Sequence, residues 1–66
     1  MPVKKFFKML ADDWGKPLSK LQEYLGQLES EMVDTVQDLE HLIADAETWG
    51  KVTSSWPIAL PKRIEA

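Results

Sequence analysis

The longest regular feature of the sequence is a leucine-rich stretch between Pro17 and Gly50 that contains no proline. Apolar residues recur through its first half at alternating spacings of three and four, which is typical of a coiled-coil seam. These residues are Leu18, Leu21, Leu25, Leu28 and Met32. Proline favours the first position of a helix and glycine favours a helix end, so both flanks fit a helix. We therefore predict one long acidic helix over residues 17–50.

The apolar stripe of this helix changes register after Met32. Its best continuation amounts to a four-residue insertion in the seven-residue repeat. The stripe also becomes wider there, as in the helices of globular bundles. We expect the helix to pair in a helical hairpin or bundle, and to bind a partner or a second copy through the stripe. The predicted interface on this helix comprises Leu18, Leu21, Leu25, Leu28, Met32, Val36, Leu39 and Ile43.

Residues 1–16 have the pattern of a short, basic, amphipathic helix. Apolar side chains fall within one arc of a helical wheel and three lysines lie on the opposite side. The apolar set is Val3, Phe6, Phe7, Leu10 and Trp14, and the basic set is Lys4, Lys5 and Lys8. Gly15 favours a helix end, which predicts a turn over residues 15–17. Two placements stay open: packing on the leucine stripe as one arm of a hairpin, or insertion of residues 1–14 into an anionic membrane surface.

Residues 51–66 are predicted to form an extended, non-helical tail. Two prolines disfavour a helix, and Trp56, Ile58 and Leu60 alternate with other residues in the period of a strand. An apolar edge stiffened by prolines is suited to binding a partner, with Trp56 as the anchor. The alternative is that Trp56 packs on the protein's own helices.

The chain is therefore expected to be all-α and to depend on assembly. A chain of 66 residues buries only a small core, and with no cysteine it has no disulfide to compensate. A protein partner, a larger complex or self-association would supply the missing buried area. No run approaches the ~20 apolar residues of a membrane-spanning helix, so we expect a cytoplasmic protein or one peripheral on a membrane.

Charge is segregated along the chain although the net charge is only −3. Residues 1–20 carry a net charge of +3, residues 21–50 carry −8 with no lysine or arginine, and residues 51–66 carry +2. Such blocks indicate interaction surfaces more clearly than the total does. Copies laid side by side in parallel would repel through the acidic block, whereas a basic neighbour would be attracted.

The sequence offers little for catalysis or for cofactor binding. His41 has Asp38 and Asp45 on the same face of the predicted helix, but that face is opposite the leucines, so we predict no metal site. There is no cysteine, no serine in a glycine elbow and no glycine-rich loop for phosphate. We expect no enzyme activity and no cofactor.

The expected function is that of a small, non-enzymatic accessory protein that binds a protein partner or assembles into a larger complex. One alternative is a peripheral membrane factor anchored by residues 1–14. A second is an acidic decoy that imitates nucleic acid in the basic groove of another protein. Direct nucleic-acid binding is not expected, because three neighbouring lysines in a chain with a pI of about 4.9 make a poor phosphate-binding surface.

Overall fold

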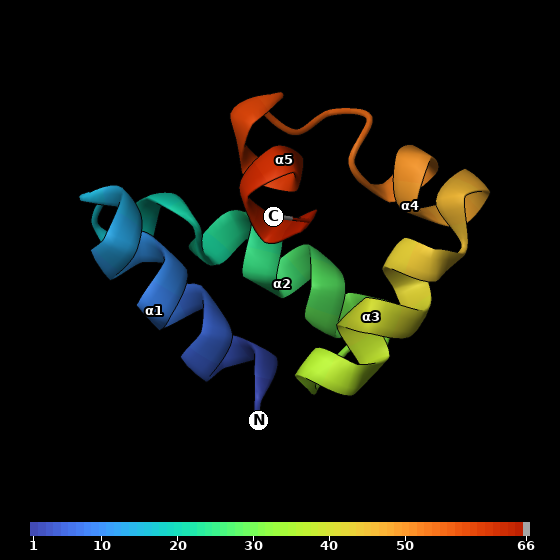
Figure 1. The fold of residues 1–66 in the computed structure, drawn as a ribbon, viewed down its shortest axis with the longest axis horizontal. Coiled ribbons are helices and arrows are strands. Elements are labelled where there is room, and N and C mark those ends of the chain that lie inside the picture. Colours follow the sequence, from blue (N-terminus) through green and yellow to red (C-terminus); the bar gives the residue numbers. More distant parts are fainter. Residues whose placement is uncertain (66) are drawn as a thin grey trace.

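Five α-helices and one turn of 3-10 helix form the fold of residues 1–65, the part of the chain that the computed structural model describes. In chain order the elements are α1 (Val3–Trp14), η1 (Leu18–Lys20), α2 (Gln22–Ser30), α3 (Val36–Ala44), α4 (Ala46–Val52) and α5 (Ala59–Glu65). In Figure 1, α2 lies in the middle, with α1 on one side, α3 and α4 on the other, and α5 above. The predicted all-α class is confirmed, whereas the single long coiled-coil helix with a non-helical tail is wrong.

The end of α1 lies where the sequence predicts it. The helix ends at Trp14, and Gly15 adopts the left-handed conformation with φ of 73°. The amide of Gly15 donates to the carbonyl of Asp12 (3.2 Å) and the amide of Lys16 donates to that of Ala11 (3.0 Å). This pair of hydrogen bonds is a Schellman motif, which satisfies the last carbonyls of a helix.

The apolar face of α1 packs into the protein's own core. Val3, Phe7 and Ala11 follow each other at intervals of four residues, and all three are buried. The helix contacts α2 and α3. Packing on the rest of the chain, as in the hairpin alternative, therefore describes the position of α1 in this structure.

The predicted helix over residues 17–50 is wrong, because η1 and three shorter helices replace it. The first break follows α2, where Met32 has φ of 62°. The amide of Val33 donates to the carbonyl of Leu28 (2.9 Å), and the amide of Met32 donates to that of Glu29 (3.0 Å). A second Schellman motif thus ends α2, and the apolar contact that accompanies such motifs is available between buried Val33 and Leu28.

A capping box then starts α3. The amide of Asp38 donates to the hydroxyl of Thr35 (3.2 Å), and the amides of Thr35 and Asp34 donate to the carboxylate of Asp38 (3.3 Å each). These bonds satisfy amides that the first turn of a helix leaves unpaired. The amide of Asp34 and the hydroxyl of Thr35 stabilise the charged carboxylate and lower the pKa of Asp38 below its usual 3.8.

Asp45 separates α3 from α4. Its carboxylate accepts hydrogen bonds from the hydroxyl (2.7 Å) and the amide (3.4 Å) of Thr48, which makes Asp45 the N-cap of α4. The same bonds lower the pKa of Asp45. The predicted helix end at Gly50 is wrong, since Gly50 lies inside α4.

The extended tail predicted for residues 51–66 is also wrong over the described residues. Residues up to Val52 belong to α4, and α5 occupies most of the remainder. Pro61 is the third residue of α5, a position at which an amide would have no acceptor within the helix, so proline is tolerated there. Ala66, the last residue of the predicted tail, lies outside the described residues.

The tail residues pack with the period of a helix. Trp56, Leu60 and Ile64 recur at intervals of four and are buried, whereas Ile58 is 76% exposed. The rings of Trp56 and Trp49 meet edge to face with centroids 5.8 Å apart. The packing of Trp56 on the protein's own helices, which the sequence left as an alternative, is therefore the observed arrangement.

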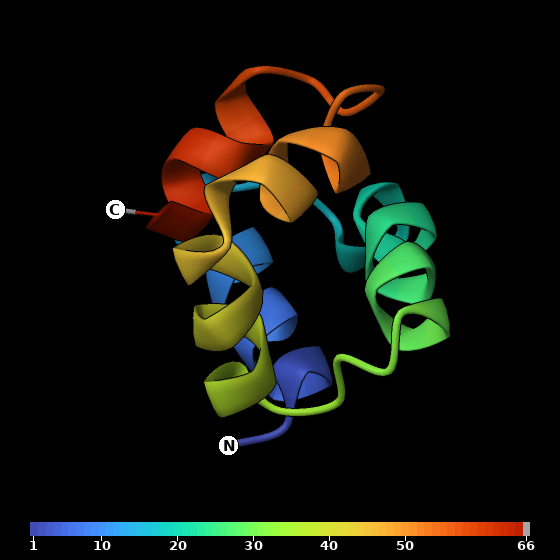
Figure 2. The same cartoon turned by 90° about the vertical axis from the view of Figure 1, so that its right-hand side faces the viewer.

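The N-terminal residues pair with the start of α3. The amide of Val3 donates to the carbonyl of Asp34 (2.9 Å), and the amide of Val36 donates to that of Met1 (2.8 Å). Pro2 and Thr35 form an isolated antiparallel bridge between these bonds. Figure 2 shows the N-terminus beside the loop that joins α2 to α3, with α4 and α5 at the opposite end of the molecule.

Every α-helix contributes to one core. Its buried residues are Val3, Phe7, Ala11, Leu21, Leu25, Leu28, Val33, Leu39, Trp49, Trp56, Leu60 and Ile64. The radius of gyration is 10.9 Å, against about 10.8 Å expected for a compact chain of this length. The accessible surface of 4474 Å² is close to the ~4,300 Å² expected for a folded monomer of this mass. The chain therefore buries a normal share of its surface without a partner.

Candidate binding site

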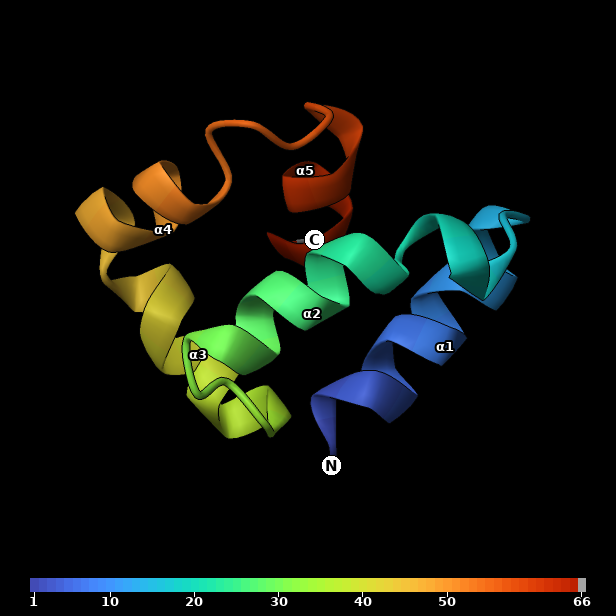
Figure 3. The ribbon, with the colours of Figure 1, turned by 180° about the vertical axis from the view of Figure 1, so that it is seen from behind.

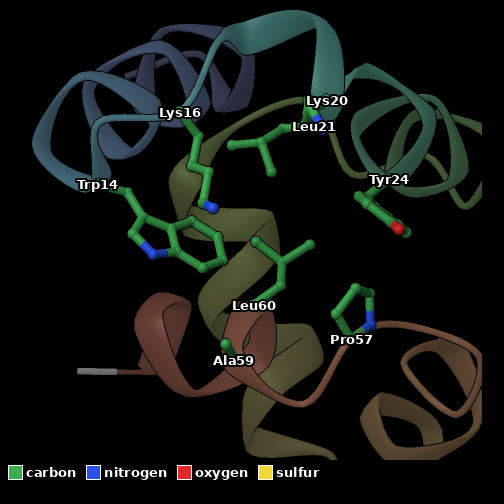
Figure 4. Close-up of a pocket in the computed structure, with 8 residues that line it drawn as sticks. All are labelled: Trp14, Lys16, Lys20, Leu21, Tyr24, Pro57, Ala59 and Leu60. Atoms are coloured by element: carbon green, nitrogen blue, oxygen red, sulfur yellow. The ribbon is translucent and has the colours of Figure 1, made fainter.

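A cavity of about 270 Å³ opens where the end of α1, η1, the start of α2 and the start of α5 meet (Figure 4). Its walls are formed by Trp14, Leu21, Tyr24, Pro57, Ala59 and Leu60, and two lysines, Lys16 and Lys20, complete the lining. We call it the Trp14 cavity. The Schellman turn at Gly15 reverses the chain after α1 and so brings Trp14 and the lysines to the same opening.

The walls of the Trp14 cavity are apolar and aromatic. Leu21 and Leu60 are buried and point toward one another in Figure 4, between the rings of Trp14 and Tyr24. Trp14 and Tyr24 are half-buried, so part of each side chain stays accessible to solvent. An apolar group entering here would exchange water for contacts with two aromatic rings.

Tyr24 is supported from behind by other aromatic residues. Its ring centroid lies 5.2 Å from that of Trp56, which in turn packs on Trp49. The indole N–H of Trp56 donates to the side-chain carbonyl of Gln27 (2.8 Å), which satisfies the polar group of a buried ring. One wall of the cavity is thus preorganised by the core.

All charged groups that line the cavity or lie on Trp14 are cationic. The ammonium of Lys16 lies 5.7 Å from the ring centroid of Trp14, and the guanidinium carbon of Arg63 lies 4.7 Å from it. Both distances are within the range of cation–π attraction. We use the name cationic rim for Lys16 and Lys20, which line the cavity, and Arg63, which lies on Trp14 but lines a neighbouring hollow. Among the described residues, 1–65, none that lines the cavity carries a carboxylate.

A second hollow, of about 620 Å³, lies on the outer side of α1 and is more open. It is lined by Phe6, Met9, Leu10, Asp12, Asp13 and Arg63. Carboxylates and a guanidinium face the same hollow, so it lacks a single sign of charge. We regard the Trp14 cavity as the better-formed site.

The structure divides the residues that the sequence predicted for partner contact into three groups. The buried residues are Phe7, Leu21, Leu25, Leu28, Leu39, Trp56 and Leu60. The half-buried residues are Phe6, Leu10, Trp14, Leu18, Val36 and Ile43. The exposed residues are Lys4, Lys5, Lys8, Met32 and Ile58. The leucine stripe lies mainly inside the protein's own core, where a partner has no access to it. Only Trp14, Leu21 and Leu60 of the predicted set meet at the cavity.

Sequence reasoning missed Lys16, Lys20, Tyr24 and Arg63 as site residues. The position of Trp14 at a segment boundary was a usable signal, because boundary residues lie near turns. Nothing in the sequence pattern relates the end of α1 to the start of α5, since that proximity arises from packing between distant segments.

Among residues 1–65 the structure forms no group of three histidine, cysteine or acidic side chains that could hold a metal ion. Asp38 and Asp45, which flank His41 in the sequence, cap α3 and α4 instead. In the same part of the chain, no helix has the length and apolar character needed to cross a membrane.

No protein-family model, curated protein or solved structure matches this chain. The chemistry of the Trp14 cavity is therefore the basis for a proposed function.

Proposed function

We propose that the protein is a non-enzymatic interaction module that binds an acidic segment of a protein partner in the Trp14 cavity. The observation that carries the proposal is an apolar, aromatic cavity that, among residues 1–65, is lined by two lysines and no carboxylate, with Arg63 lying on its Trp14 wall. Its volume of about 270 Å³ lies just below the ~300–1,000 Å³ of typical small-molecule sites, so it suits one anchoring side chain. Carboxylates beside that anchor would meet the cationic rim.

The groups at this site argue for binding rather than for catalysis. General acid–base or nucleophilic chemistry needs a nucleophile within reach of a base. Within the part of the chain that the structure describes, the ionisable side chains of the cavity are two lysines and one tyrosine, and no histidine or carboxylate joins them in its lining.

Membrane anchoring and nucleic-acid mimicry receive less support. The apolar face of α1 is occupied by the core, so inserting that face into a membrane would require α1 to leave its place. The acidic block of residues 21–50 is divided among α2, α3 and α4, so its carboxylates do not form the single rod that the decoy hypothesis assumed.

The proposal is tested with a blocked peptide in which one methionine stands between two pairs of glutamates. We expect it to shift the NMR signal of the Trp14 indole, and a peptide with lysines in place of the glutamates to leave that signal unchanged. The double variant Lys16→Glu/Lys20→Glu should weaken binding of the acidic peptide at least ten-fold.

The matched control carries the same change of charge on exposed α1 lysines that do not line the cavity, Lys5→Glu/Lys8→Glu. This control should retain most of the affinity. Equal binding of both peptides, or an equal loss in both double variants, would mean that the cavity does not select an acidic segment.

A further inference from the structure

The turn after α2 presents an exposed methionine in an unusual backbone conformation. Met32 is 80% exposed, which is more than any other large hydrophobic residue in the described chain. It occupies the left-handed position of a Schellman motif, with φ of 62°. The equivalent position after α1 holds glycine, the residue that this conformation favours. We call residues 29–34 the Met32 turn.

A methionine at this position is unfavourable for the fold in two ways. The left-handed conformation strains a residue that has a Cβ atom, and the exposed side chain gains nothing from burial in the monomer. Local rules of this kind are broken mainly at functional sites, where a side chain is needed for another purpose. We therefore treat the exposed Met32 side chain as a candidate contact for a binding partner.

We propose that the Met32 turn inserts into the Trp14 cavity of a second copy of the chain. This inference rests on the proposed function and names the partner. Methionine is flexible and makes favourable sulfur–aromatic contacts, which suits a cavity walled by Trp14 and Tyr24. Exposed Glu29, Glu31 and Asp34 flank Met32 in the sequence, and their negative charge is opposite in sign to the cationic rim of the cavity.

The two surfaces lie at opposite ends of α2. Leu21 is the N-cap of α2 and Tyr24 lies in its first turn, whereas Met32 follows the end of the helix. Figure 3 shows the length of α2 between these two ends. Nine residues at about 1.5 Å each separate the ends by about 14 Å, so the turn of one copy does not reach its own cavity. The contact is therefore head-to-tail, and repeating it builds a ring or an open chain of copies.

The head-to-tail arrangement brings oppositely charged parts of two copies together. Side-by-side parallel packing would oppose acidic blocks, whereas head-to-tail contact places the acidic turn of one copy on the basic rim of the next. One turn entering one small cavity buries far less than the ~1,200 Å² of a stable interface. The association should therefore be weak and should weaken further as salt screens the charges.

Sedimentation velocity of the full chain tests the inference. At protein concentrations up to about 1 mM, where even contacts of millimolar affinity are substantially occupied, the parent should form species larger than a dimer, and added salt should reduce them. Met32→Gly should abolish these species without unfolding the chain, because glycine suits the left-handed position. The matched control is Met9→Ala, which removes another exposed methionine and should associate like the parent.

Mixing two defective variants gives the sharper result. Met32→Gly keeps the cavity and lacks the methionine, whereas Lys16→Glu/Lys20→Glu keeps the methionine and lacks the basic rim. Each alone should be monomeric, and the mixture should form dimers and nothing larger, since only one productive contact exists per pair. A parent that stays monomeric throughout, a Met32→Gly variant that associates like the parent, or a mixture without dimers would overturn the inference.

Binding of the acidic peptide distinguishes a failure of the self-association proposal from a failure of the proposed function. If self-association is absent but the peptide still binds at Trp14, the cavity serves an acidic partner other than a second copy. If the peptide also fails to bind, the proposed function fails with the inference.

Discussion

Gly15 and Met32 occupy the same position in two Schellman motifs. Both adopt the left-handed conformation, but the steric cost of that conformation differs between the two residues. Each residue is left-handed and follows a helix whose last carbonyls accept the next two amides. Glycine adopts the left-handed conformation without steric cost, whereas in methionine the Cβ atom comes too close to the backbone. The end of α1 is therefore stabilised by its sequence, and the end of α2 is formed against the preference of its sequence.

Replacing Met32 by glycine should stabilise the monomer. Relief of the left-handed strain is worth about 1 kcal/mol, less the entropy that glycine adds to the unfolded chain. For a domain of this size 1 kcal/mol raises Tm by roughly 4–8 °C. Thermal unfolding at low protein concentration measures the change.

The reciprocal variant serves as the control. Gly15→Ala should lower Tm by a similar amount, although space for a Cβ atom is open at Gly15. A Tm for Met32→Gly at or below that of the parent would show that the turn carries no strain.

Caps decided the helix boundaries of this protein more strongly than apolar periodicity did. Leu39 and Ile43 follow the seam spacing of a continuous helix, but Thr35 and Asp38 form a capping box that starts a new one. A threonine followed three residues later by an acid is a recognised start signal, so this boundary could have been predicted. The Schellman motif at Met32 could not have been predicted, because the glycine that usually marks this motif in a sequence is absent there.

The tail prediction failed for a related reason. Pro57 and Pro61 disfavour a helix in the sequence pattern, but proline is excluded from a helix only beyond the first turn. With Pro61 third in α5, the spacing of Trp56, Leu60 and Ile64 is that of a buried helical face. The end of α1 was predicted correctly because it depends on one local signal, Gly15.

Acidification should destabilise α3 and α4 through their caps. The folded protein lowers the pKa of Asp38 and Asp45, so the unfolded chain binds protons first as pH falls. Their contribution to stability is complete above the ordinary value of 3.8, and it disappears as pH falls through the lower values of the folded state. Urea midpoints measured from neutral pH downward should therefore fall most steeply below about pH 4.

Asp45→Asn isolates this titration, because asparagine caps a helix about as well as aspartate. This variant should match the parent near neutral pH and lose less stability in acid. Acid sensitivity equal to that of the parent would mean that the Asp45 carboxylate has the same pKa in the folded and unfolded chain.

The whole chain depends on its last helix, because α5 completes both the core and the Trp14 cavity. Leu60 is 1% exposed and lines the cavity, whereas Ile58 in the preceding turn is 76% exposed. A chain of 66 residues has a free energy of unfolding of roughly 3–10 kcal/mol. Contributions from single core residues of α5 are large on that scale.

Truncating Leu60 should therefore endanger the fold. Leu60→Ala is expected to cost about 2–5 kcal/mol, because it removes apolar contacts and leaves a void. The matched change Ile58→Ala should stay within about 0.5 kcal/mol of the parent. Chemical denaturation compares the two, and equal losses would show that α5 does not pack as described.

The pairing of the N-terminal residues with the start of α3 makes the middle of the chain sensitive to its beginning. The amide of Val36 would be an unpaired donor in the first turn of α3, and the carbonyl of Met1 accepts its hydrogen bond. Removing that carbonyl would expose the Val36 amide to exchange with solvent deuterium, although the two residues are far apart in sequence. The exchange rate at Val36 thus reports whether the first residues of the chain are in place, so one amide proton monitors the closure of a loop that spans half the molecule.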